Sequence, residues 1–115
     1  MTQSNSESTE PVVRDAPEKK RFEVVVGGDV AGFTQYVDHD EQRIFYHTEI
    51  GEQYAGRGLA STLIAFALAE TRGAGQRIVP ICPFVARYLE KHDDFADIAD
   101  PVTPAAHRAV KNSTA

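Results

Sequence analysis

A glycine-rich turn between a strand-like run and a helix-like run is the feature that most constrains this chain. The turn is Gly56-Arg57-Gly58, the run before it is Arg43 to Ile50, and the run after it is Leu59 to Arg72. A turn of this kind exposes backbone N–H groups that have no partner inside the helix it opens. Those donors and the helix dipole favour a bound anion. The turn therefore predicts a phosphate-bearing ligand that is held by the backbone.

Hydrophobic periodicity on both sides of the turn predicts an α/β domain. The expected elements are strands over 22–26, 30–37 and 43–50, a helix over 59–72, a strand over 77–82 and a helix over 84–92. The first three strands form an antiparallel meander, and Gly27-Gly28-Asp29 makes its first hairpin turn. The unit from Arg43 to Cys82 makes a right-handed parallel crossover. The order βββαβα predicts a mixed sheet with two main helices.

Two details of the strands bear on the site. Alternation over Arg43 to Ile50 predicts one face made of Ile44, Tyr46, Thr48 and Ile50, and the other of Phe45, His47 and Glu49. Pro80 predicts an edge position or a bulge for the last strand, because proline cannot donate to a strand ladder.

Both ends of the chain differ in composition from its centre. Met1 to Arg21 is polar and aperiodic, which is typical of a disordered tail. Thr103 to Ala115 is predicted to be a similar C-terminal tail, with a short helical turn over Ala105 to Val110 as the alternative. At 115 residues the chain has room for one small domain. We therefore expect that domain to span Phe22 to Val102, that is, residues 22–102 between tails 1–21 and 103–115.

Charge and cysteine content exclude several classes of function. The formal net charge of −5 argues against a general nucleic-acid binder, which needs a basic face. A single cysteine, Cys82, excludes an intrachain disulfide, and neither the cysteine nor the four histidines have metal-ligand spacing. No apolar run approaches the roughly 20 residues that span a bilayer, and Met1 opens no signal-peptide pattern. A cytoplasmic protein without a metal or a membrane partner is the expectation.

Three motifs in this order resemble the GNAT superfamily of acyl-CoA-dependent N-acetyltransferases. They are His47-Thr48-Glu49, then Gly56-Arg57-Gly58-Leu59-Ala60, then Cys82-Pro83-Phe84-Val85-Ala86-Arg87-Tyr88. The second motif is similar to the pyrophosphate loop of that superfamily, and all three together resemble its minimal, single-domain, YjdJ-like branch. The likeness covers Phe22 to Ile98. It implies a compact GNAT-like fold, acetyl-CoA as cosubstrate and an amine acceptor, which is a small molecule or a protein.

The resemblance also implies which residues bind acetyl-CoA. They are Ile50, Ala55, Gly56, Arg57, Gly58, Leu59, Ala60, Ser61, Cys82 and Tyr88. Two departures from the superfamily pattern matter. Ala55 stands where glutamine or arginine is common, so one side-chain contribution to phosphate binding is missing. Met1 to Arg21 does not resemble the helices that wall the acceptor site in larger members, so we expect that site to be open or completed by another molecule.

Acetyl transfer requires that an amine lose a proton and that the leaving thiolate gain one. Glu49 and His47 are the candidate proton acceptors; the alternative is a solvated Glu49 and a packed His47. Tyr88 is the candidate acid, by its resemblance to a superfamily tyrosine, or else a core aromatic. Cys82 is either a nucleophile that accepts acetyl transiently or a small buried residue lining the slot.

These residues predict an N-acetyltransferase that passes acetyl directly from acetyl-CoA to an amine. A noncatalytic acyl-CoA-binding module that acts through a partner protein is the main alternative. A third possibility is a small structural protein whose glycine-rich loop binds nothing.

Overall fold

Five strands form one mixed sheet in their order along the chain, β1-β2-β3-β4-β5. The computed structural model describes residues 10–114. The strands are β1 Val12–Ala16, β2 Arg21–Val26, β3 Asp29–His39, β4 Gln42–Ile50 and β5 Arg77–Pro80. Strands β1 to β4 pair antiparallel, and β5 pairs parallel with β4. Three α-helices complete the fold: α1 Leu59–Gly73, α2 Pro83–Lys91 and α3 Pro104–Thr114.

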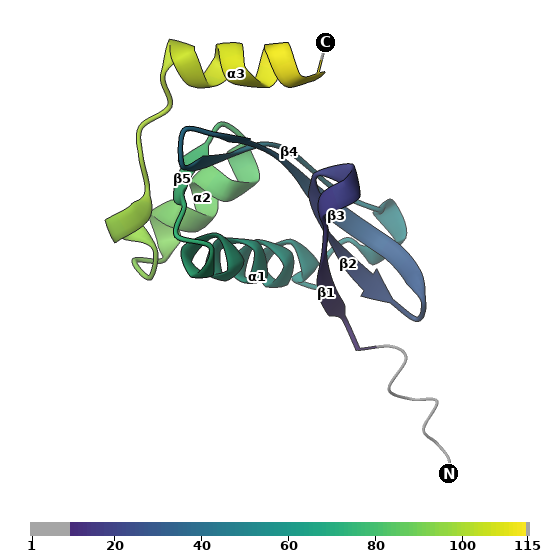
Figure 1. Ribbon diagram of the computed structural model, residues 1–115. Coiled ribbons are helices and arrows are strands. Elements are labelled where there is room, and N and C mark those ends of the chain that lie inside the picture. The colour runs from purple at the N-terminus through teal and green to yellow at the C-terminus, as the bar shows by residue number, and fades with distance from the viewer. Residues whose placement is uncertain (1–9, 115) are drawn as a thin grey trace.

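Helices cover both faces of the sheet (Figure 1). Helices α1 and α2 lie on one face, which we call the inner face, and α3 lies across the opposite, outer face. The main core fills the inner layer and includes Phe22, Phe45, Leu63, Ile78 and Val85. A smaller core of Ile44, Val79, Ala106 and Ala109 lies under α3. The predicted fold class, a small α/β domain with a mixed sheet, is confirmed.

Both predicted tails contribute elements to this fold, so the expectation that they lie outside the folded domain is wrong within the described residues. Val12–Ala16 forms the edge strand β1, followed by a short 3-10 helix, η2 Pro17–Lys19. Pro104–Thr114 forms α3. The domain therefore extends beyond the predicted 22–102 at both ends. The part of the predicted N-terminal tail from Met1 to Thr9 lies outside the described residues.

Strand β1 and helix α3 bury few and small apolar side chains, which explains why their sequences resemble tails. In β1 only Ala16 is buried, and the strand is held mainly by its backbone ladder with β2. Helix α3 is amphipathic, but its buried residues are the small alanines Ala106 and Ala109. Small side chains give a weak hydrophobic signal, because the driving force scales with the apolar area removed from water.

A β-bulge in β4 corrects the predicted alternation. Gln35 pairs with His47 but Tyr36 pairs with Phe45, which leaves Tyr46 as the extra residue. Phe45 therefore faces the inner core, as Thr48 does, whereas His47 and Glu49 face outward. The prediction that Phe45 shares a face with His47 and Glu49 is wrong, because a period of two cannot pass through a bulge.

Strands β4 and β5 separate halfway along β4. Their pairing covers Gln42–Phe45 with Arg77–Pro80, and the Cys82 N–H then donates to the Phe45 carbonyl at 2.9 Å. Strand β5 ends at Pro80, two residues earlier than predicted, and lies at the edge of the sheet as Pro80 indicated. The second half of β4, residues 46–50, pairs with β3 alone among the described strands. The sheet is therefore open at this point, next to the start of α1.

Candidate functional site

The glycine-rich loop opens α1 without a side-chain cap. Gly56 and Gly58 have φ values of +83° and +74°, a region that glycine adopts at little cost. None of the backbone N–H groups of residues 56–61 donates to another described residue. Six free donors at the positive end of a helix dipole suit an anion such as a phosphate.

A cleft of about 440 Å³ lies between this loop and the open half of β4. Its lining residues are Thr48, Glu49, Ile50, Tyr54, Ala55, Gly56, Gly58, Leu59, Ala60, Ser61 and Phe84. A second hollow, of about 220 Å³, shares Ala60, Ser61 and Phe84 with the first and continues along α2 past Arg87, Tyr88, Lys91 and His92. The shared lining makes one elongated cleft that runs from the open strand across the start of α1.

Most of the predicted ligand-binding residues meet in this cleft. Ile50, Ala55, Gly56, Gly58, Leu59, Ala60 and Ser61 line its larger part, and Tyr88 lines the smaller. Arg57 is exposed on the loop, and its guanidinium carbon lies 5.5 Å from the centre of the Tyr54 ring. It is therefore beside the cleft and not in its lining.

Cys82 is the predicted residue that the cleft does not expose. Its side chain is 1% exposed, and its Sγ lies 3.0 Å from the Thr48 Oγ1. The Thr48 hydroxyl lies 2.9 Å from the hydroxyl of Thr34, so three polar groups form a short buried chain in the inner core. Cys82 also precedes Pro83 at the start of α2. This thiol is packed against the point where β4 and β5 separate.

His47 and Glu49 form an exposed pair on the outer face. The His47 Nε2 and Glu49 Oε2 lie 2.8 Å apart, and the side chains are 46% and 61% exposed. Glu49 lines the cleft and also a separate outer hollow of about 200 Å³. Arg21 and Phe33 are among the other residues around that hollow. Glu49 is therefore the one residue that the described linings of the cleft and the outer hollow share.

Tyr88 presents a protonated hydroxyl to the cleft. Burial raises the pKa of Tyr88 above its ordinary value of 10.0, and the nearby charge of Asp94 adds to this effect. The Tyr88 ring packs on His92, with 4.3 Å between the ring centres. Tyr88 is thus a proton donor, not an acceptor, across the neutral range.

Sequence reasoning did not identify Tyr54 and Phe84 as lining residues. Phe84 is 39% exposed, which is unusual for a large apolar side chain, and it borders both parts of the cleft. Its helical spacing made it look like a core residue. Tyr54 lies in the short η3 helix, Glu52–Tyr54, which the sequence did not signal.

Two classes of site are absent from the described part of the chain. Residues 10–114 contain no group of three or more histidine, cysteine, aspartate or glutamate side chains placed to hold a metal ion. None of the described helices is both long and apolar enough to cross a membrane.

Comparison with known proteins identifies relatives of this fold. The model of the GCN5-related N-acetyl-transferase family matches residues 21–98. The NMR solution structure of a GCN5-like protein from Staphylococcus aureus superposes with a TM-score of 0.62 at 19% sequence identity. The match covers 89% of this chain and 95% of that one. No curated protein sequence matches the chain significantly.

Proposed function

This chain belongs to the GCN5-related N-acetyltransferase family, and we propose that it transfers the acetyl group of acetyl-CoA directly to an amine acceptor. The observation that carries the proposal is the position of Glu49. Glu49 borders both the cleft beside the glycine-rich loop and the outer hollow, where an acceptor has room to approach. A proton acceptor between two binding spaces is what a direct transfer needs.

The hydrogen-bond donors around the cleft suit the phosphates of acetyl-CoA. The six free N–H groups of residues 56–61 suit a pyrophosphate, and Arg57 adds a cation beside them. The open side of β4, residues 46–50, supplies unpaired strand edge along the rest of the cleft. Acetyl-CoA supplies an activated acetyl thioester when bound. Because Ala55 stands where glutamine or arginine is common, the backbone N–H groups are the main phosphate ligands.

The side chains around the cleft divide the proton transfers between them. Glu49 accepts the proton that the amine loses, and His47, in contact with Glu49, helps to pass it to solvent. Tyr88 donates a proton to the departing thiolate from the α2 side of the cleft. Cys82 lies behind Thr48, outside the lining of the cleft, and forms no acetyl intermediate, in keeping with its burial.

A ligand titration followed by product analysis tests this function. Acetyl-CoA is expected to bind, and a panel of amines and lysine peptides is expected to contain acceptors that gain one acetyl group by mass spectrometry. Absence of acetyl-CoA binding would contradict the proposal. Tight binding without turnover on any acceptor would instead favour the noncatalytic acyl-CoA-binding module.

Intact-mass measurement separates the direct route from a covalent one. The protein mixed with acetyl-CoA alone is expected to keep its mass. A stoichiometric acetyl adduct that is absent in Cys82→Ala and disappears on adding amine would overturn the direct route. In that case Cys82 would be the nucleophile.

A further inference from the structure

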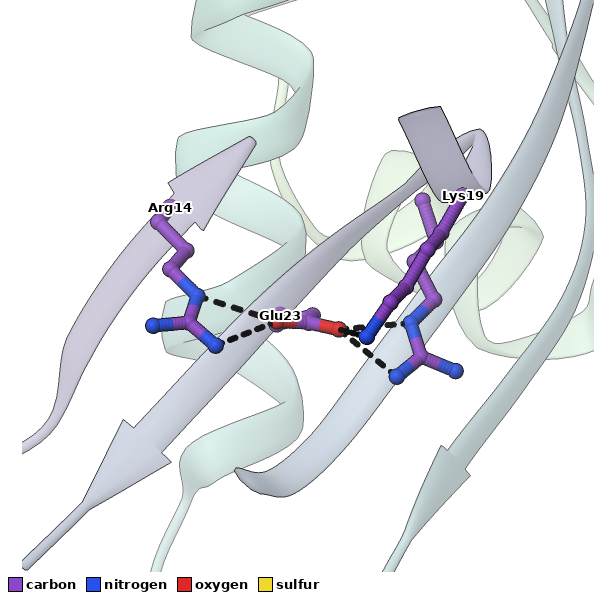
Figure 2. A network of polar contacts seen from close by, with 4 residues as sticks. Arg14, Lys19 and Glu23 are labelled. Carbon is purple, nitrogen blue, oxygen red and sulfur yellow. Dashed lines mark hydrogen bonds and ion pairs between the residues drawn. The ribbon is translucent and has the colours of Figure 1, made fainter. Parts of the chain in front are cut away.

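Three cations surround one buried carboxylate on the outer face of the sheet (Figure 2). Glu23 is 1% exposed, although none of the described α-helices covers the outer face at this point and only the short η2 helix lies beside it. The Nη2 of Arg14 lies 2.8 Å from its Oε1 and that of Arg21 lies 2.6 Å from its Oε2, while the Lys19 Nζ lies 3.8 Å from Oε2. We call Arg14, Lys19 and Arg21 the cationic cluster.

The cationic cluster carries more positive charge than Glu23 neutralises. Burial acts to raise the pKa of Glu23, but hydrogen bonds from Arg14 and Arg21 outweigh it and hold that pKa below its ordinary value. Glu23 is therefore ionised at neutral pH, and three cations against one carboxylate leave a net charge of +2. Such a surplus stands out in a chain whose formal net charge is −5.

Part of this surplus remains available to a ligand. Arg14 and Arg21 each contact Glu23 through Nε and Nη2. Neither Nη1 group donates to another described residue in this arrangement. The Arg14 and Lys19 side chains are 56% and 55% exposed. Free guanidinium donors of this kind suit a carboxylate or another planar acidic group.

The register of the sheet places the cationic cluster on the same face as Glu49, the proposed proton acceptor. Arg14 pairs with Glu23, Glu23 with Phe33, and Phe33 with Glu49, so these residues form one row across the outer face. The Arg21 guanidinium lies 4.4 Å from the centre of the Phe33 ring. Arg21 and Glu49 also border the same outer hollow.

We propose that the cationic cluster binds an acidic group of the amine acceptor, so that the acceptor is a peptide segment with a carboxylate near its reactive amine. This inference rests on the proposed function of the Glu49 site. Arg21 lies on β2, two strand spacings or about 10 Å from β4, and Arg14 lies on β1, three spacings or about 14 Å from β4. An extended peptide covers these distances in about three to four residues. An amino acid that reacts at its α-amine is too short, because that amine and the carboxylate are attached to the same carbon atom.

Matched peptides test the inference with the full chain. Each peptide contains one lysine, with glutamate or glutamine three or four residues before or after it. The readouts are kcat/KM for acetylation and, separately, affinity by fluorescence anisotropy in the presence of CoA. The glutamate peptide in one of the two orientations is expected to exceed its glutamine partner by about threefold or more in both readouts.

Charge variants show whether the cationic cluster causes the preference. Lys19→Gln and Arg14→Gln are each expected to bring the glutamate-to-glutamine ratio towards one. Lys19 lies in η2, outside the ladder, so its variant tests the inference even if Arg14→Gln loosens β1. Lys20→Gln makes the same charge change at an exposed neighbour whose charge acts on Asp38, and it is expected to keep the ratio.

The outcomes separate this inference from the proposed function. Equal use of all peptides by the parent protein, or a preference that persists in both Lys19→Gln and Arg14→Gln, would overturn the inference and leave acetyl transfer standing. Cluster-dependent binding of the acidic peptide without acetylation would support the recognition site and contradict the transfer reaction.

Discussion

The two halves of β4 have opposite surroundings. Residues 42–45 pair with β3 on one side and β5 on the other, and Ile44 and Phe45 are completely buried. Residues 46–50 pair with β3 alone, and His47 and Glu49 are exposed beside a cleft. The change occurs at the Tyr46 bulge. One continuous strand thus stabilises the fold with its first half and presents chemical groups with its second.

The largest expected effect is on stability, from the closed half. Phe45→Ala is expected to lower the free energy of unfolding by about 3–5 kcal/mol, because it leaves a cavity in the core. The melting temperature should fall by more than about 10 °C. Denaturant titration measures the loss. The matched variant Phe84→Ala, at a partly exposed position, should cost far less stability. Equal losses in the two variants would contradict the contrast.

In the open half the effect should move from stability to catalysis. Glu49→Gln keeps the shape of the side chain but removes the proton acceptor, and kcat should fall about a hundredfold. Stability should change by less than about 0.5 kcal/mol, as for most exposed positions. Steady-state kinetics measure the loss of kcat, and thermal melting measures the change in stability. Glu52→Gln, the same change at a nearby exposed residue, is the control.

The sequence predicted the helices and the glycine-rich loop better than it predicted which way the side chains of β4 face. Helices α1 and α2 and the glycine-rich loop followed from apolar spacing and turn chemistry. The sequence did not predict that Phe45 faces the inner core. That orientation follows from the Tyr46 bulge, which depends on pairing with β3 and has no signal in the local sequence pattern. Backbone pairing across a sheet is a property of two segments together.

The site was predicted more completely on its backbone side than on its side-chain side. The turn at Gly56 and Gly58 could be predicted, because a left-handed backbone conformation favours glycine. The role of Arg14 beside Glu23 is not readable, because β1 looks like part of a polar tail and its contacts arise from the β1–β2 register. The catalytic roles of Glu49, His47, Tyr88 and Cys82 stay predictions, as does the narrower YjdJ-like likeness.

A smaller catalytic effect is expected on the opposite wall of the cleft. Tyr88→Phe removes the proposed proton donor, and kcat should fall about tenfold while the KM for acetyl-CoA changes little. The raised pKa of Tyr88 keeps the parent enzyme's donor protonated until the pH exceeds 10.0, so its kcat should not decline below that pH through Tyr88. A kcat in Tyr88→Phe equal to that of the parent would contradict the donor role. A loss of activity near pH 8 in the parent but not in Tyr88→Phe would contradict the raised pKa of Tyr88.

The smallest effect is expected at the junction of the two halves. Cys82→Ala should keep kcat within about threefold of the parent, because a thiol buried behind the cleft contributes packing and not chemistry. A modest loss of stability should accompany it, since Cys82 is buried against Thr48. Loss of nearly all turnover in a folded Cys82→Ala protein would contradict a packing role.

The central claim is that the open half of β4 and the uncapped start of α1 form the acetyl-CoA site. Gly58 and Gly75 test it directly, because both have φ of +74°, neither has an atom within 4 Å of an added Cβ, and they flank the same helix. Gly58→Val and Gly75→Val should therefore suffer similar backbone strain. Melting curves with and without millimolar acetyl-CoA should show stabilisation of the parent and Gly75→Val but not of Gly58→Val. Equal stabilisation of both variants, or none in the parent, would contradict the claim.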